Sequence, residues 1–378
     1  MIPSRRTWGV AVLLAGFAGA ASAHHSATAY DLEKSIEWKV TVEKFQFVNP
    51  HAYVYFKMQN AAGKQVNGRC ELPAVTTLRR VGWTPTTLRP GQKVTIKGSP
   101  GRNEENVCYM VSFIDENGQE IGRGEDLTKG GPNPAATLAA KNQAATRPAR
   151  LPDGHPNLNG PWVAVGAEGR GPGARYPDEK GGEKKAAKKG PPPGGRGGPP
   201  RPEETEAGKA AAKNYDQPFD DPAIKCDPAN IFFGWVHDRH VNEVTQTPKE
   251  ITLKYGYMDF VRTIHLDQKE HPKSIKPSRG GHSIGSWDAD TLVVDTVGFA
   301  PGVLIPIIGV MHSNQMHVVE RFTFDPATRI MTREYRADDP LYLKNPHTGR
   351  DLMSISDEPY TRYNCVELSG KNNMRSSK

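Results

Sequence analysis

The chain of 378 residues lacks several features that mark common classes of protein. After residue 18, no apolar run approaches the roughly 20 residues that a membrane helix needs, so we expect no membrane-spanning segment in the mature protein. The sequence contains no HExxH, P-loop or GxGxxG motif, which argues against zinc proteases and nucleotide-binding enzymes. It also contains no repeat of fixed period, which argues against solenoids and propellers.

Most of the excess of positive over negative charge, which gives a formal net charge of +7, lies in one segment and at the N-terminus. Residues 167–213 contain eleven Lys and Arg against seven Asp and Glu, and Arg5 and Arg6 add two positive charges near the N-terminus. The remainder of the chain is therefore nearly neutral. No basic stripe with interleaved aromatic residues is left to follow a phosphate backbone, so we do not expect nucleic acid as a partner.

Cysteine is rare, and its four positions suggest pairing in an exported protein. Cys70 and Cys108 fall in the first half of the chain, whereas Cys226 and Cys365 fall in the second. Four cysteines allow three connectivities, and the absence of a CxxC pair argues against a metal knuckle. We expect structural disulfides that join Cys70 to Cys108 and Cys226 to Cys365.

Residues 1–23 are typical of a signal peptide. Arg5 and Arg6 precede an apolar run, and the small residues ASA at positions 21–23 form a cleavage site. We therefore expect a periplasmic or secreted protein with His24 as its first residue. The arginine pair is compatible with the general and the twin-arginine export routes.

Composition divides the mature chain into two folded units. The polar, Ala-rich stretch at 122–150 is typical of a linker. Residues 167–213 are so rich in Pro, Gly and Lys that we expect them to be disordered. The two units are then residues 24–121 and residues 151–378, the second interrupted by the disordered insertion.

Both units show the alternation of apolar and polar residues that is typical of half-buried strands. In the first unit, about five short strands and a helix near residues 73–81 predict a small OB-like barrel. In the second, turns near Gly256, at residues 288–290 and at residues 326–328 join neighbouring strands into a meander. We therefore predict a mainly β protein in which a larger up-and-down, lipocalin-like barrel of about eight strands follows the small one.

Two sets of motifs resemble uncharacterised families of exported bacterial proteins. The expected mature start HHS at 24–26, the pair YD at 30–31 and the tripeptide NPH at 49–51 resemble a family of small proteins. Another resemblance, to an exported β-rich domain, is carried by DGHPNLNGPW (153–162), SIGSWDADTLVVDT (283–296) and HSNQMHVVERF (312–322). Both resemblances imply an architecture, and neither implies an activity.

Histidines near the mature N-terminus are candidate metal ligands. His24 would offer its amine and its imidazole, and His51 would add a second imidazole from a strand, with His25 as an alternative ligand. Three nitrogens in this arrangement suit copper, which prefers tetragonal nitrogen ligation. The alternative is that the histidine pair is merely tolerated beside the cleavage site and that His51 makes an ordinary hydrogen bond. Copper is the one cofactor that the sequence suggests.

The second unit carries candidate catalytic residues for acid–base chemistry, which are His282, Asp295, His312, His317 and Glu320. Alternation along residues 315–324 places either Glu320 or His317 in the barrel interior. A histidine paired with Asp295 or Glu320 would suit proton abstraction, isomerisation or elimination. The alternative is that the two carboxylates form structural ion pairs with Arg262 or Arg321.

Aromatic and branched residues of the second unit favour an apolar ligand, and the candidate binding residues are Tyr255, Arg262, Trp287, Phe299 and Arg321. The run GVLIPIIGV (302–310) predicts either a flap over the barrel mouth or a loop folded into the core. We expect an exported protein that binds an apolar or aromatic small molecule in a barrel pocket, as a cofactor-independent isomerase, lyase or hydrolase. The alternatives are a periplasmic copper-binding protein and a non-catalytic partner of an exported enzyme.

Overall fold

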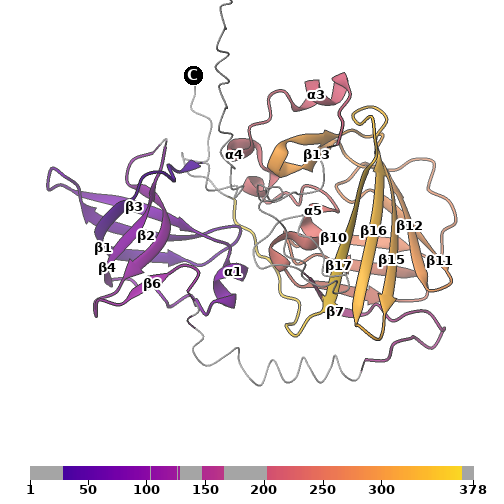
Figure 1. Ribbon diagram of the computed structural model, residues 1–378, viewed down its shortest axis with the longest axis horizontal. Helices are drawn as coiled ribbons and strands as arrows, with labels where there is room; N and C mark the ends of the chain where they lie inside the picture. Colours follow the sequence, from indigo (N-terminus) through magenta and orange to yellow (C-terminus); the bar gives the residue numbers. More distant parts are fainter. Residues whose placement is uncertain (1–28, 103, 126, 128–146, 166–201, 368–378) are drawn as a thin grey trace, which may run out of the picture.

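The computed structural model describes residues 29–102, 104–125, 127, 147–165 and 202–367, which form two β-barrels (Figure 1). The expected signal peptide, His24, His25 and most of the expected linker and insertion lie outside the described residues. The mainly β fold predicted from the alternation of apolar residues is confirmed.

The first barrel has the OB-like arrangement that the sequence predicts. Its strands are β1 (Ile36–Gln46), β2 (Ala52–Gln59), β3 (Gln65–Leu72), β4 (Lys93–Pro100) and β5 (Val107–Ile114), with β6 (Glu120–Gly122) added beside β5. They run in the order β3-β2-β1-β4-β5, and the parallel pairing of β3 with β5 closes the barrel. Between β3 and β4 lies α1 (Val75–Arg80), at the place where a helix was expected.

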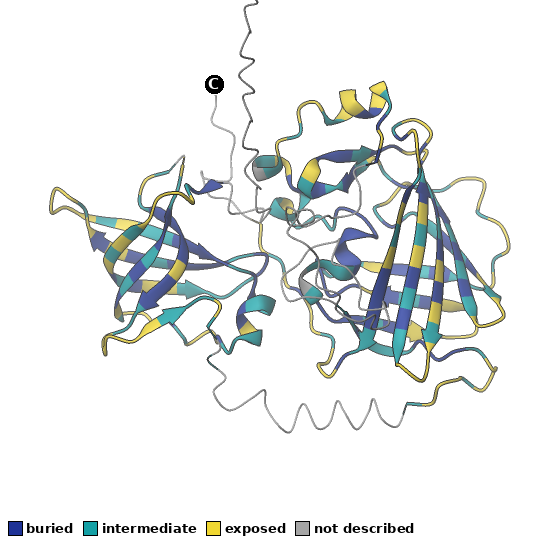
Figure 2. Cartoon of the chain, viewed as in Figure 1, coloured by how far each residue is buried: buried dark blue, intermediate teal, exposed yellow. Residues whose placement is uncertain are grey.

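Burial alternates along the strands because one face of each points into the barrel, as Figure 2 shows. On β2, Val54, Phe56 and Met58 are buried in the core, whereas Lys57 and Gln59 are exposed. The predicted disulfide between Cys70 and Cys108 is confirmed, and it joins β3 to β5 at their parallel pairing. The alternation therefore shows which residues of this barrel face outward, and the disulfide joins β3 to β5 where the barrel closes.

The second barrel contains nine strands where the sequence predicts about eight. They are β7 (Gly160–Ala164), β8 (Asn242–Gln246), β9 (Glu250–Lys254), β10 (Val261–His265), β11 (His282–Asp288), β12 (Thr291–Val297), β15 (His317–Asp325), β16 (Ile330–Asp338) and β17 (His347–Ile355). Neighbouring strands are antiparallel except β10 and β11, which are parallel. Since antiparallel strands alternate in direction, a closed ring with an odd number of strands requires such a parallel pair. The predicted hairpins β9–β10, β11–β12 and β15–β16 are all present.

The parallel pair determines the path of residues 266–281, because two parallel strands cannot be joined by a tight turn. This segment, the crossover, runs beside the end of β12 before it enters β11. The Ser278 amide donates to the Gly298 carbonyl at 3.2 Å, and the Ala300 amide donates to the Ser278 carbonyl at 2.8 Å. The crossover therefore places side chains on the outer face of the barrel near the end of β12, which the strands alone would leave uncovered.

Short elements cover one end of the second barrel. They are α3 (Glu206–Ala212), α4 (Gln217–Asp220), η2 (Pro222–Lys225), α5 (Phe233–Val236), η3 (His237–Arg239), β13 (Gly302–Ile305), η4 (Pro306–Ile308) and β14 (Val310–His312). The run 302–310 is thus a hairpin interrupted at Pro306, and its Leu304 and Val310 belong to a buried cluster. Residues 202–213 correct the expected extent of disorder: Thr205 caps α3 by accepting from the Gly208 amide.

Asn49 connects the two barrels and gives the NPH tripeptide a structural role. Its side chain accepts a hydrogen bond from the Val75 amide at 3.0 Å and donates to the Tyr363 carbonyl at 2.7 Å. The Val366 amide donates to the Asn49 carbonyl at 2.7 Å. The segment that holds Tyr363 and Val366 is fixed to the second barrel by the predicted disulfide between Cys226 and Cys365, which is confirmed.

Candidate functional site

Five polar side chains gather on the outer face of the second barrel, where β10, β11, β12 and β15 lie side by side. We call them the imidazole cluster: His265, His271, His282, Asp295 and His317. His282, Asp295 and His317 were predicted as candidates from the sequence. His265 and His271 were missed, although five of the twelve histidines of the chain fall between residues 265 and 317. This local density of histidines was the signal from which the sequence could have predicted the two missed residues.

Strand register explains why three members of the cluster meet. Along β12, Leu292, Val294 and Thr296 are buried, so Asp295 points outward. Asp295 lies opposite Ile284 of β11 and Val319 of β15. His282 and His317 each lie two residues before those partners, which makes them diagonal neighbours of Asp295 on the same face.

A continuous chain of hydrogen bonds joins four members of the imidazole cluster. His317 Nε2 lies 2.7 Å from Asp295 Oδ2, and His271 Nε2 lies 2.9 Å from Asp295 Oδ1. His271 Nδ1 lies 2.8 Å from His282 Nδ1. His271 comes from the crossover, so the parallel pairing of β10 with β11 completes the chain.

If His271 is neutral, the order of partners determines which nitrogens in this chain carry protons. An ionised Asp295 only accepts, so the Nε2 atoms of His271 and His317 both donate to it. In neutral His271 the other nitrogen, Nδ1, is then an acceptor, and the Nδ1–H of His282 donates to it. This leaves Nε2 of His282 without a proton, as a basic nitrogen.

The electrostatic environments of Asp295 and His282 agree with the states assigned to these two residues. Partial burial raises the pKa of Asp295, but hydrogen bonds from His271 and His317 outweigh burial and hold this pKa below its usual value. The pKa of His282 is lowered, chiefly by partial burial and further by His271 and His265. The ring of His265 stacks on that of His282, with centroids 5.1 Å apart. Both shifts favour a neutral His282 and an ionised Asp295, which are linked through His271.

Glu320 lies inside the barrel, in a different site from the imidazole cluster. It is fully buried, bonds to Arg262, and lies 3.5 Å from Nη1 of Arg333. Arg333 also bonds to Asp351, which completes a buried network of two arginines and two carboxylates. The contacts of Glu320 match the alternative in which it forms an ion pair with Arg262. Of the two candidates on β15, Glu320 points into the barrel and His317 points outward.

Ser283 occurs in GHSIG (281–285), which has the GxSxG spacing of serine hydrolases. That motif requires a sharp turn between a strand and a helix, with the serine hydroxyl exposed. Here Ser283 lies within β11 and is buried. Its hydroxyl accepts from Arg262 Nε at 2.9 Å and lies 3.0 Å from the Thr296 hydroxyl. Ser283 is therefore a residue of the barrel interior, and the GxSxG spacing does not mark a nucleophile elbow in this chain.

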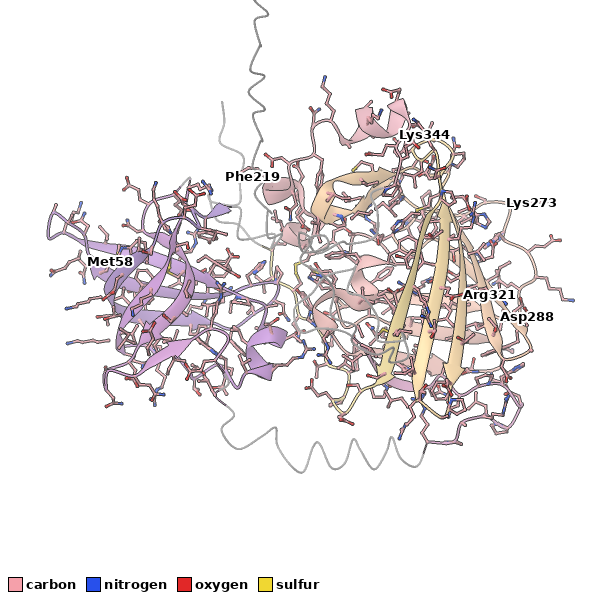
Figure 3. The ribbon with its side chains drawn as sticks, in the orientation of Figure 1. Met58, Phe219, Lys273, Asp288, Arg321 and Lys344 are labelled. Carbon is pink, nitrogen blue, oxygen red and sulfur yellow. A yellow bond between two sulfur atoms is a disulfide. The ribbon has the colours of Figure 1, made fainter. Side chains whose placement is uncertain are left out.

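The other predicted residues lie at separate places. His312 ends β14 and is buried, with Nδ1 3.1 Å from the Ser313 carbonyl. Among the expected ligand-binding residues, Tyr255 and Arg262 are buried inside the barrel, and Phe299 belongs to the buried cluster of Leu304. Trp287 shares the inward side of β11 with Ser283 and Gly285, packs against the barrel core and stacks on His155, with ring centroids 4.6 Å apart. Arg321 lies on the outer face and pairs with Asp288 at 3.0 Å (Figure 3). They do not line one pocket.

In the small barrel, His51 lies beside the fully buried Glu71, with 3.4 Å between His51 Nδ1 and Glu71 Oε1. The hydroxyls of Tyr30 and Tyr53 donate to Glu71 Oε2 at 2.9 and 3.1 Å. Within the described ranges, no group of three or more His, Cys, Asp and Glu side chains is arranged to hold a metal ion. The other expected metal ligands, His24 and His25, lie outside those ranges.

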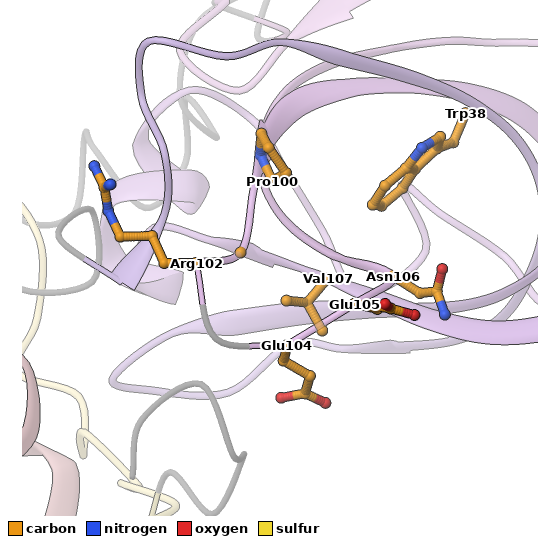
Figure 4. A pocket seen from close by; sticks show the side chains of 8 residues that line it. Trp38, Pro100, Arg102, Glu104, Glu105, Asn106 and Val107 are labelled. Atoms are coloured by element: carbon orange, nitrogen blue, oxygen red, sulfur yellow. The ribbon is translucent and has the colours of Figure 1, made fainter. Parts of the chain in front are cut away.

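Two surface depressions also lie on the small barrel. One has a volume of about 470 Å³ and is lined by Trp38, Pro100, Gly101, Arg102, Glu104, Glu105, Asn106 and Val107 (Figure 4). The other, of about 400 Å³, lies between β1, β2 and β4. Neither contains a residue that the sequence singled out for a site.

Comparison with known proteins adds a family match for the N-terminal part. Residues 12–109 match a family described as a family of unknown function (DUF6152). The match spans β1 to β4 and the beginning of β5. No curated protein and no solved structure matches the chain. In the part of the chain that the structure describes, no helix has the length and apolar character needed to cross a membrane.

Proposed function

We propose that this is an exported protein with an acid–base site at the imidazole cluster, in which His282 is the general base. The observation that carries the proposal is the chain of hydrogen bonds from His317 through Asp295 and His271 to His282. Two disulfides support export, because such bonds persist in oxidising compartments.

Proton transfer along the chain explains how His282 would work. When Nε2 of His282 takes a proton from a substrate or from water, its Nδ1 proton passes to Nδ1 of His271. His271 then carries the positive charge next to the Asp295 carboxylate, which stabilises it. His317 binds the second oxygen of that carboxylate and holds it in position.

This arrangement suits reactions that begin with proton abstraction, such as isomerisation and elimination, or hydrolysis by an activated water. None of these steps needs a cofactor. The site lies on the outer face of the barrel, so its substrate would be a small molecule that binds from solvent. That the molecule is apolar or aromatic, and that the barrel interior binds it, stay predictions.

The test uses hydrolysis of p-nitrophenyl acetate, an activated ester, by the mature protein. A positioned general base contributes roughly 10²–10⁴-fold, and with a non-native ester we expect His282→Gln to lower the rate at least about tenfold. His155→Gln is the matched control, because His155 is a histidine of the same barrel outside the imidazole cluster. Equal rates for the two variants would contradict the proposal.

A pH profile provides a second readout. The lowered pKa of His282 means that the base is already unprotonated below the ordinary histidine value of about 6.5. The rate should therefore reach its plateau before neutral pH. A profile that still rises between pH 7 and pH 9 would show that another group is the base.

A further inference from the structure

The two disulfides of the protein differ in how far solvent can reach them. Cys70 and Cys108 are fully buried in the core of the first barrel. Cys226 and Cys365 are only partly buried, against a small cluster that contains Tyr257. Exposed disulfides are the ones that thiols reduce readily, whereas buried disulfides resist reduction. The second disulfide is therefore the one that a thiol can reach in the folded protein.

The backbone of Cys226 is in an unfavourable conformation. Cys226 follows the last residue of η2 and has a φ of 55°. Such a left-handed φ costs free energy for a cysteine, and it persists only where the surrounding structure holds the residue in place. The bond to Cys365 is one of the restraints on Cys226. Breaking that bond therefore allows the backbone to relax, which favours an opened state.

The C-terminal segment that this disulfide fastens, residues 356–367, has few other anchors. It follows β17 and contains neither helix nor strand. Within this described segment, only its first residue and Tyr363 are buried, and the ring of Tyr363 packs against that of Tyr257 with centroids 5.1 Å apart. The amides of Tyr363 and Asn364 donate to Asp259 at 2.8 and 3.0 Å. These hydrogen bonds are part-buried or exposed, so water competes for the same groups and their net contribution is small.

The same segment contacts the first barrel through Asn49. The Val366 amide donates to the Asn49 carbonyl, and the Asn49 side chain donates to the Tyr363 carbonyl, both at 2.7 Å. Between these two contacts, Cys365 lies opposite Asn49 in an isolated parallel bridge. The disulfide therefore fixes to the second barrel the residues that bind the first barrel, and its loss would loosen the connection between the two.

From these observations we infer that the disulfide between Cys226 and Cys365 is a site of thiol–disulfide exchange with a dithiol, and that its reduction releases the C-terminal segment from the first barrel. A thiolate of the dithiol attacks one sulfur of the pair, the sulfur–sulfur bond breaks, and the other sulfur leaves as a thiolate that takes up a proton. The second thiolate of the dithiol then breaks the mixed disulfide. The dithiol is oxidised to a disulfide, and the two cysteines are reduced to thiols.

The test of the exchange site treats the folded, mature protein with dithiothreitol, a small dithiol, and stops samples at intervals with N-ethylmaleimide. Mass spectrometry then measures how much of each disulfide has been reduced. We expect the bond between Cys226 and Cys365 to be reduced at least about tenfold faster than the buried bond between Cys70 and Cys108, which is the matched control in the same chain. Circular dichroism checks that both barrels stay folded. Equal rates for the two disulfides would overturn the inference.

Hydrogen exchange tests the release of the C-terminal segment. In the reduced protein, the amides of Tyr363, Asn364 and Val366 should lose protection at least about tenfold, whereas the amides of β16 should keep theirs. The double variant Cys226→Ser, Cys365→Ser should exchange like the reduced wild type, and reduction of the wild type keeps the test decisive if this variant fails to fold. Unchanged protection of the three amides after reduction would show that the disulfide does not hold the segment, and would overturn the inference.

Discussion

Glu320 and Arg321 are adjacent on β15 but belong to opposite environments, and this contrast is testable at the scale of single residues. Glu320 is buried with Arg262 and Arg333, whereas the side chain of Arg321 is 46% exposed in its pair with Asp288. Removing one partner of a buried network costs about 3–5 kcal/mol, and an exposed pair contributes about 0–1 kcal/mol. Glu320→Ala should therefore lower the free energy of unfolding in urea far more than Arg321→Ala. Similar losses would contradict the buried network.

His347 gives the second barrel a pH-dependent stability. Burial, and then Arg333, lower the pKa of His347 to about 4. Below pH about 6.5, the ordinary pKa of histidine, the His347 imidazole is protonated in the unfolded chain but stays neutral in the folded chain. The free energy of unfolding therefore falls as the pH decreases from about 6.5 to about 4.

Between pH 7 and pH 4.5, this single group should account for a loss of about 2–3 kcal/mol. His347→Gln should remove that part of the pH dependence, while His155→Gln, which changes a histidine outside this site, should keep it. Urea unfolding at the two pH values measures the difference. The same slope in His347→Gln and wild type would show that His347 is not the group responsible.

Strands were predictable at the scale of elements, because alternation reports which face of a strand is buried. Val318, Glu320 and Phe322 illustrate the limit of that signal: one face of β15 is the interior, and its buried carboxylate interrupts the apolar pattern. Arg333 comes from β16, whose hairpin with β15 was predicted, but Arg262 comes from β10, and the sequence does not show that this strand places an arginine beside Glu320 in the barrel interior.

The imidazole cluster was only partly predictable for the same reason. His282, Asp295 and His317 lie on predicted strands, so their shared face follows from register. His271 lies in the polar crossover, and its position depends on the parallel pairing that closes a ring of nine strands. Glu71, which lies beside His51, was missed because its neighbours Tyr30 and Tyr53 come from other parts of the chain.

Gly256, in the connection between β9 and β10, tests the packing of that hairpin against β8. A Cβ atom at this position would lie 2.3 Å from the Val241 carbonyl oxygen. The Gly256 amide donates a hydrogen bond to the side-chain oxygen of Asn242. Gly256→Ala should cost about 1–3 kcal/mol, because backbone must move to make room. Gly124→Ala is the control, with no atom within 4 Å of its Cβ. Equal thermal unfolding of both variants would contradict the close approach.

Asn49 tests how the two barrels are joined at the scale of the whole molecule. Asn49→Ala removes the hydrogen bonds to Val75 and Tyr363, which connect the first barrel to the segment tied down by Cys365. We expect calorimetry to show the two barrels unfolding in more widely separated transitions than in the wild type. Asn60→Ala, which affects only the turn after β2, should leave the profile unchanged. An unchanged profile for Asn49→Ala would mean that other contacts join the barrels.

The imidazole cluster depends on the whole second barrel, since its members come from β10, the crossover, β11, β12 and β15. Its central claim is that His282 is neutral and carries its proton on Nδ1. Long-range ¹H–¹⁵N NMR of the mature protein at pH 7 reads this directly. We predict a protonated Nδ1 and an unprotonated Nε2 for His282, with a titration midpoint below about 6.5. A protonated Nε2, or an imidazolium at pH 7, would contradict the account.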